Sequence, residues 1–254
     1  MIKFFRKIRQ SLLTENKFSK YLLYAIGEIV LVVIGILIAL SINNSNNVKE
    51  QRKIEQEYLV SLQSEFKTNL NKINACLTEN LERINATEDM LTLFDIYILD
   101  NVNDSTISSI FYSVMSGEAT FMPSNGVLTD IISSGNLNLI QNAQLRQHLA
   151  SFESELDFLK LQETSTHSLK DKMRSQINKY GSVRKILLDR GQNFENNSIS
   201  DTMNNRQMFR LIEFENNLLV YHLTIKAANG IRFFGGIKEH IEQILVELDS
   251  ELKK

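Results

Sequence analysis

The sequence has few of the residues that build disulfide frameworks, metal sites and tight turns. It contains one cysteine, one proline and no tryptophan among 254 residues. A single cysteine excludes an intramolecular disulfide framework and the zinc sites that need paired thiolates. One proline and ten glycines disfavour a fold of many short strands joined by turns. The chain therefore favours long, uninterrupted elements.

Neither sign of charge dominates the composition. The chain has 28 Lys+Arg against 30 Asp+Glu, a formal net charge of −2. This balance excludes a protein held to nucleic acid mainly by bulk positive charge. A hydrophobic content of 43% is sufficient for the core of one large domain or two small ones.

The common catalytic and ligand-binding motifs are also missing. The sequence has no P-loop, no GxGxxG, no GxSxG, no HExxH and no EF-hand loop. Two Ser-x-x-Lys spacings, Ser64 to Lys67 and Ser182 to Lys185, occur without the motifs that accompany them in Ser-Lys enzymes. We therefore predict a protein that is not an enzyme and has no cofactor and no metal site.

What the sequence does contain is one long apolar run near its N-terminus. Residues 22–42 carry Glu28 as their only charge. As a helix the run spans about 30 Å, the thickness of a bilayer core. Its Leu, Ile and Val residues favour insertion by about 4 to 8 kcal/mol in all, which exceeds the cost of about 2.5 to 3.5 for one central charge. The run predicts a transmembrane helix over 21–42; a cleavable signal peptide is the alternative, but its apolar region would be shorter.

Basic residues flank this run unequally. Six Lys and Arg occur in residues 1–20, and only Lys49, Arg52 and Lys53 in the 20 residues that follow the run. The positive-inside rule then predicts a cytoplasmic segment 1–20 and a periplasmic domain 43–254, in a single-pass protein of the inner cell membrane. Residues 1–13 also have amphipathic spacing, so they either lie as a helix on the inner leaflet or serve only as the topology signal.

The rest of the chain is predicted to be all-α and to form a bundle of long helices. Apolar residues recur every seven positions from Leu70 to Ile98, typical of a coiled-coil or bundle seam. Long helices are expected at about 47–100 (as one rod or two in series), 143–181 and 205–252, the last weakened by Gly230, Gly235 and Gly236. Short helices are expected at about 106–116 and 125–134, ending at Gly117 and Gly135.

The segment 101–142 between these helices has an unusual charge pattern. No Lys or Arg occurs from residue 84 to residue 145. The segment therefore either packs partly inside the bundle or forms a docking face for a partner.

One polar group falls on the predicted seam. Glu163 and His167 are four residues apart on a helix and share a face, and Glu163 occupies a core position. His222 is a candidate third member of a buried polar layer, with Asn80 or Thr87 opposite. Such a layer either sets the register of the bundle, binds a metal or ligand, or is absent because the helix turns Glu163 toward water.

Glu28 is the other unexpected polar residue. On a helix it shares a stripe with Gly35, and Ala39 lies at the edge of that stripe. The stripe can pack against another membrane helix, with Glu28 hydrogen-bonding across the interface. Alternatively, Glu28 snorkels toward the cytoplasmic headgroups.

Two segments carry a family resemblance. The run NKFSKYLLYAIGEI at 16–29, continued by VLVVIGILIALSINN, and the block SGNLNLI at 134–140, followed by Leu145 and Arg146, resemble an uncharacterised family of single-pass membrane proteins from Bacteroidota. Members usually carry Trp soon after the membrane segment, where this chain has Ser45, so the resemblance does not extend to an aromatic anchor on the outer face. The resemblance implies the topology above and no activity.

Three classes of function are compatible with these features. The first is a membrane-anchored, non-catalytic helical interaction module of the cell envelope, whose partners are the lipid bilayer and either a second copy or another envelope protein. The second is a ligand-binding, sensor-like helical domain that acts through a separate partner protein. The third, an enzyme, lacks a recognisable constellation of nucleophile, base or metal ligands.

Overall fold

The computed structural model describes residues 18–253, and every regular element in that range is helical. The all-α prediction is therefore confirmed. The chain divides into two compact units, Met1–Glu57 and Tyr58–Lys254, and α2 (Phe18–Thr92) contributes to both. The amphipathic helix predicted over 1–13 lies outside the described residues.

The first unit consists, where it is described, of the N-terminal part of α2. Its apolar side chains are exposed, including Leu23 at 76% and Leu31 at 63%. Among residues 18–253, α2 is the one helix long and apolar enough to cross a membrane. The run predicted to span the bilayer is thus a helix without a protein core of its own.

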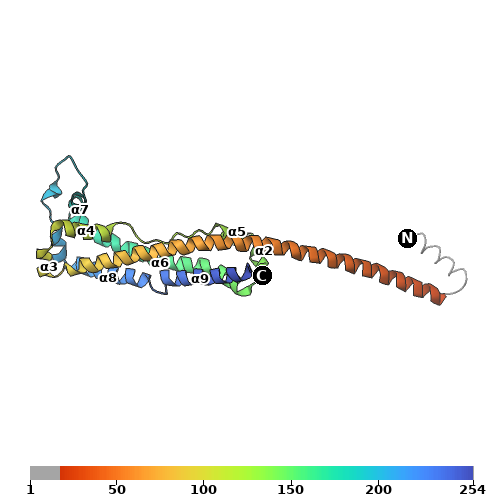
Figure 1. Cartoon of the computed structure of the whole chain (residues 1–254). Helices are drawn as coiled ribbons and strands as arrows, with labels where there is room; N and C mark the ends of the chain where they lie inside the picture. Colours follow the sequence, from red (N-terminus) through yellow and green to blue (C-terminus); the bar gives the residue numbers. More distant parts are fainter. Residues whose placement is uncertain (1–17, 254) are drawn as a thin grey trace. The chain divides into compact units, whose positions relative to one another are not determined.

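The second unit is a helical bundle (Figure 1). The part of α2 after Glu57 lies beside α6 (Ala143–Tyr180), α8 (Ile212–Ala228) and α9 (Phe234–Glu251). Shorter elements complete it: α3 (Ile96–Asn101), α4 (Asp104–Met115), α5 (Gly126–Ser133), α7 (Val183–Asp189) and the 3₁₀ turns η1 (Asn136–Leu139), η2 (Ile199–Thr202) and η3 (Asn205–Arg210).

Two separate apolar clusters fill this bundle. The first joins α2 from Leu59 to Cys76 with α5, the start of α6 and α9. The second joins α2 from Ile84 to Met90, and Leu93 just after α2, with α4, η3, the end of α6 and α8. Both clusters include residues of the 101–142 segment, so this segment packs on the bundle, the first of its two predicted alternatives.

The helix expected over 47–100 is interrupted. α2 ends at Thr92, and the side chain of Asp95 accepts hydrogen bonds from the backbone N–H groups of Tyr97 and Ile98 to start α3. This N-cap shifts the register: Ile98, predicted on the seam, is 37% exposed, whereas Leu99 is buried. The predicted heptad repeat fails at Ile98 because the side chain of Asp95 hydrogen-bonds the backbone N–H groups of the next turn and starts a new helix there.

The helix expected over 205–252 is also divided, into η3, α8 and α9. The break between α8 and α9 falls at the predicted glycines. A Cβ on Gly236 would lie 2.0 Å from the carbonyl oxygen of Ile231, so only glycine fits this close approach. Gly117 and Gly135 have φ of 52° and 74°, the left-handed conformation expected of glycines that end helices.

A side chain of α2 caps α5. The residue before α5, Asn125, makes no side-chain capping hydrogen bond. Instead, Glu65 accepts hydrogen bonds from the backbone N–H groups of Val127, at 2.7 Å, and Leu128, at 3.1 Å. A buried carboxylate at a helix N-terminus satisfies free N–H groups and complements the helix dipole.

Glu65→Gln should therefore lower the free energy of unfolding by about 1 to 2 kcal/mol, because the amide loses the charge and one acceptor oxygen. Chemical denaturation of the full chain in detergent micelles measures the loss. The matched control is Glu82→Gln, an exposed position on α2, which should change the value by less than about 0.5 kcal/mol. Equal effects of the two substitutions would contradict the capping role.

Candidate functional site

A polar region separates the two apolar clusters of the bundle. On α2 the first cluster ends at Cys76 and the second begins at Ile84, and on α6 the gap runs from Leu159 to Met173. A cavity of about 280 Å³, which we name the central cavity, lies at this level. Its lining residues come from α2, the α4–α5 connector, α6, α8 and α9: Asn80, Arg83, Glu118, Ala119, Thr120, Gln162, Glu163, Thr164, Thr166, His167, Tyr221, Ile225, Ala228 and Phe234.

Lys170 lies buried beside this cavity. Its side chain is 0% exposed, and Nζ donates to the carbonyl oxygens of Gly117 and, at 3.4 Å, Ser116. Oε1 of Glu118 is 3.8 Å from the same Nζ. Burial, together with the positive charge of Arg83, lowers the pKa of Lys170 to about 7. The ammonium is thus held by two carbonyls and one carboxylate in a place that disfavours its charge.

The α4–α5 connector closes the cavity. The thiol of Cys76 donates to the carbonyl oxygen of Thr120 at 3.2 Å, and Oε1 of Glu163 accepts from the backbone N–H of Phe121 at 2.8 Å. Arg83 donates to the carbonyl of Ser116 at 3.4 Å. Side chains of α2 and α6 therefore satisfy the backbone of a segment that has no helical hydrogen bonds of its own.

Three buried polar atoms at the cavity have no hydrogen-bond partner in the described part of the chain. They are Nε of Arg83, the hydroxyl of Tyr221 and Oε1 of Glu118. Arg83 is 9% exposed and Tyr221 0%. Burial raises the pKa of Tyr221, and Arg83 and Glu118 act on it electrostatically. Because buried polar atoms are nearly always satisfied, these atoms mark where a ligand or an ordered water would bind.

The structure brings together two of the three residues predicted for a polar layer. Glu163 and His167 both line the central cavity, but the side chain of His167 is 56% exposed, so the prediction that it is buried is wrong. Burial raises the pKa of Glu163, while Nδ1 of His167 lies 2.9 Å from Oε2 of Glu118. His222 is placed apart: its Nδ1 lies 2.8 Å from Oγ1 of Thr87.

Sequence reasoning missed four residues of this site: Arg83, Glu118, Lys170 and Tyr221. Lys170 left a usable signal. It lies seven residues after Glu163 and seven before Ile177, on the same heptad stripe. Glu118 belongs to an irregular connector, where periodicity carries no information.

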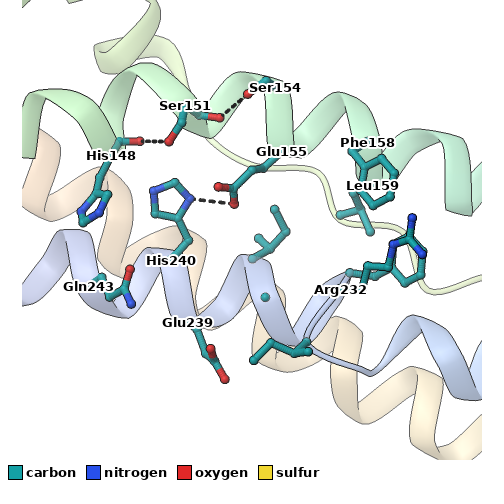
Figure 2. A pocket seen from close by; sticks show the side chains of 14 residues that line it. His148, Ser151, Ser154, Glu155, Phe158, Leu159, Arg232, Glu239, His240 and Gln243 are labelled. Atoms are coloured by element: carbon teal, nitrogen blue, oxygen red, sulfur yellow. Dashed lines mark hydrogen bonds and ion pairs between the residues drawn. The ribbon is translucent and has the colours of Figure 1, made fainter.

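A second cavity, of about 480 Å³, lies between α6 and α9 (Figure 2). Nδ1 of His240 is 2.7 Å from Oε2 of Glu155, and the rings of His148 and His240 are 5.4 Å apart, edge to face. Nδ1 of His148 also lies 3.1 Å from Oε1 of Glu247, whereas Nε2 of His240 has no hydrogen-bond partner in the described part of the chain. Over residues 18–253, no group of three His, Cys, Asp or Glu side chains is arranged to hold a metal ion.

The predicted membrane-helix stripe lies in the first unit. Gly35 and Ala39 are exposed and Glu28 is half-buried. A Cβ on Gly35 would meet nothing within 4 Å, so a second helix could approach closely at that point.

Comparison with known proteins places the chain in a family without supplying an activity. No curated protein and no solved structure matches it. One family model matches residues 28–188, a range that includes Glu163 and Lys170 and ends before α8. The chain thus belongs to the family of unknown function DUF6090.

Proposed function

We propose that this chain is a membrane-anchored, non-catalytic helical interaction module of the cell envelope. The observation that carries the proposal is the exposure of the apolar run 22–42 within a continuous helix. Left in water, such a surface costs about 25 cal/mol per Å² of apolar area, and a bilayer removes that cost. The resemblance to single-pass proteins of Bacteroidota supports the same anchor.

The asymmetry of basic residues supports the orientation. Six cations precede the apolar run within residues 1–20 and three follow it in the next 20 residues. With the N-terminus in the cytoplasm, the helical bundle belongs to the periplasm.

An exposed apolar face supports the interaction role. On α8, Ile212, Leu219 and Leu223 are 75%, 40% and 63% exposed. Their spacing places them on one side of the helix, opposite the buried Phe214 and Leu218. Several large apolar side chains exposed on one side of a helix favour a contact surface, either with a second copy or with another envelope protein.

The central cavity favours a second candidate function, a ligand-binding, sensor-like domain that acts through a separate partner protein. Its support is the set of three unsatisfied buried atoms that line one cavity. Ligand binding and membrane anchoring are compatible, because they use different units of the chain.

The anchor is tested by fractionation. The full chain should stay in the membrane pellet after a high-salt and alkaline carbonate wash, whereas a triple variant with Leu31, Ile34 and Ile38 changed to Lys should move to the supernatant. Each charge at the centre of a spanning helix costs about 2.5 to 3.5 kcal/mol, and three exceed the insertion energy of the run.

The matched control carries three Lys on the exposed face of α8, at Leu219, Val220 and Leu223, and should remain in the pellet. Protease added to intact spheroplasts should digest the bundle if it is periplasmic. Wild-type chain in the wash supernatant would overturn the anchor, and a protected bundle would overturn the orientation.

A further inference from the structure

We propose that the central cavity binds a small organic monoanion, a short-chain aliphatic carboxylate. The inference rests on the second candidate function and names its ligand class. Four features of the cavity support this ligand class: its position between the apolar clusters, the unsatisfied atoms that line it, the charged side chains around it and its apolar end.

The two unsatisfied donors favour a ligand that carries hydrogen-bond acceptors. Nε–H of Arg83 can only donate, and the hydroxyl of Tyr221 can donate to the same group. Both residues are at least nine-tenths buried, so neither atom regains a partner from bulk water. A carboxylate offers two acceptor oxygens to two such donors, and hydrogen bonds between ionised partners are the strongest of this type.

The charge around the donors favours an anion. Arg83, Lys170 and Arg174 gather at one level of the bundle, since Arg83 and Arg174 both lower the pKa of Lys170. Arg174 is paired with Asp171 at 3.1 Å. Glu118 lies 3.8 Å from Lys170, whereas Arg83 forms no ion pair in the described part of the chain, so a carboxylate would supply the partner that Arg83 lacks.

The carboxylates in the wall do not oppose this charge strongly. Glu118 is already engaged, with Oε2 2.9 Å from His167 and Oε1 3.8 Å from Lys170. Burial raises the pKa of Glu163, and its Oε1 accepts a hydrogen bond from the backbone of Phe121.

The other end of the cavity is apolar. Asn80 donates to the carbonyl of Ile225 at 2.7 Å. Residue 80 of α2 therefore lies at the level of residue 225 of α8, one helical turn from Arg83 and Tyr221. Beyond this level the lining includes Ala228 and Phe234. A ligand with its carboxylate at Arg83 would direct its aliphatic part toward these side chains.

The volume limits the size of the ligand. A cavity of about 280 Å³ has room for a ligand of several non-hydrogen atoms. Hexanoate, with eight non-hydrogen atoms, is a probe of suitable size.

The probe is radiolabelled hexanoate, measured by equilibrium dialysis against the full chain in detergent micelles, with empty micelles subtracted. We expect saturable binding of one molecule per chain. Acetate, which lacks the aliphatic part, and hexan-1-ol, which lacks the charge, should each compete at least tenfold more weakly than unlabelled hexanoate.

Two variants test whether the residues that line the cavity bind the probe. Tyr221→Phe removes one oxygen and Arg83→Met removes the guanidinium, and each should weaken binding at least tenfold. Lys226→Met is the matched control: it removes a cation from α8 outside the cavity, at a side chain 61% exposed, and should leave affinity within twofold. Circular dichroism confirms that each variant is folded, and Tyr221→Phe alone suffices if Arg83→Met unfolds.

Each result decides the inference. No saturable binding would mean that water fills the cavity, and unchanged affinity in Tyr221→Phe would place the probe elsewhere; both overturn it. Neither affects the membrane anchor, because fractionation depends on residues 22–42 alone. Conversely, a chain found in the wash supernatant would overturn the anchor while hexanoate binding stands.

Discussion

The free energy of unfolding should rise by about 1 to 2 kcal/mol between pH 7 and pH 9, because burial lowers the pKa of Lys170 from 10.5 to about 7. Below pH 7 this lysine is protonated in the folded and the unfolded chain alike, and the full cost of burying its charge is present. Between pH 7 and 10.5 only the unfolded chain keeps the proton. The unfolded state then binds more protons, so stability rises with pH.

Denaturant titrations of the full chain in micelles at pH 7, 8 and 9 measure this slope. Lys170→Met should abolish it, because methionine does not titrate. Lys172→Met, an exposed lysine two residues along α6, is the control that should retain it. A flat wild-type profile, or the same slope in Lys170→Met, would contradict the assignment.

The rise should reverse above pH 9. Burial raises the pKa of Cys76 from 9.0 to about 11 and raises that of Tyr221 above its ordinary value of 10.0. For these two groups the unfolded chain loses its proton first, so it binds fewer protons than the folded chain and stability falls as pH increases. Cys76→Ala should reduce the fall between pH 9 and 11 and leave the rise below pH 9 unchanged.

Periodicity predicted the bundle because burial of one helical face is a repeating requirement. Of the positions predicted from Leu70 to Ile98, Ile84 is buried, whereas Leu70, Leu77 and Leu91 are partly buried against the two apolar clusters. The buried stripe of α2 lies beside them, at Phe66, Ile73, Asn80 and Thr87. Thr87 also lies opposite His222, one of the two residues proposed for that place. Periodicity failed beyond Thr92, because the cap formed by Asp95 is a local hydrogen-bonding choice that overrides the repeat.

The site was less predictable than the fold. Glu163 and His167 were found because they share a helical face, and the cavity joins them. Arg83 and Glu118 line the same cavity because the α4–α5 connector packs along α2, over a sequence distance that no helical period spans. Lys170 could be found as a heptad position, but its effect depends on the carbonyls of Ser116 and Gly117, whose positions require the fold.

Phe214→Ala should lower the free energy of unfolding by about 3 to 5 kcal/mol, the largest loss we expect from one side chain. Phe214 is fully buried in a cluster of four rings that belong to four segments of the chain. Its ring centroid lies 5.9 Å from Phe111 of α4, 6.0 Å from Phe209 of η3 and 6.2 Å from Phe94, in the turn after α2. Truncation leaves a cavity that rings fixed by four separate elements cannot close.

The midpoint of thermal unfolding should fall by roughly 6 to 20 °C for a domain of this size. Leu223→Ala, 63% exposed on the same helix, is the control and should change stability by less than about 0.5 kcal/mol. A loss below about 1 kcal/mol in Phe214→Ala would mean that the cluster repacks.

Because Phe214 does not line the central cavity, the folded variant should bind hexanoate within twofold of wild type. Substitutions in the cluster and in the cavity wall thus separate stability from binding, although Phe214 and Tyr221 are only two turns apart on α8.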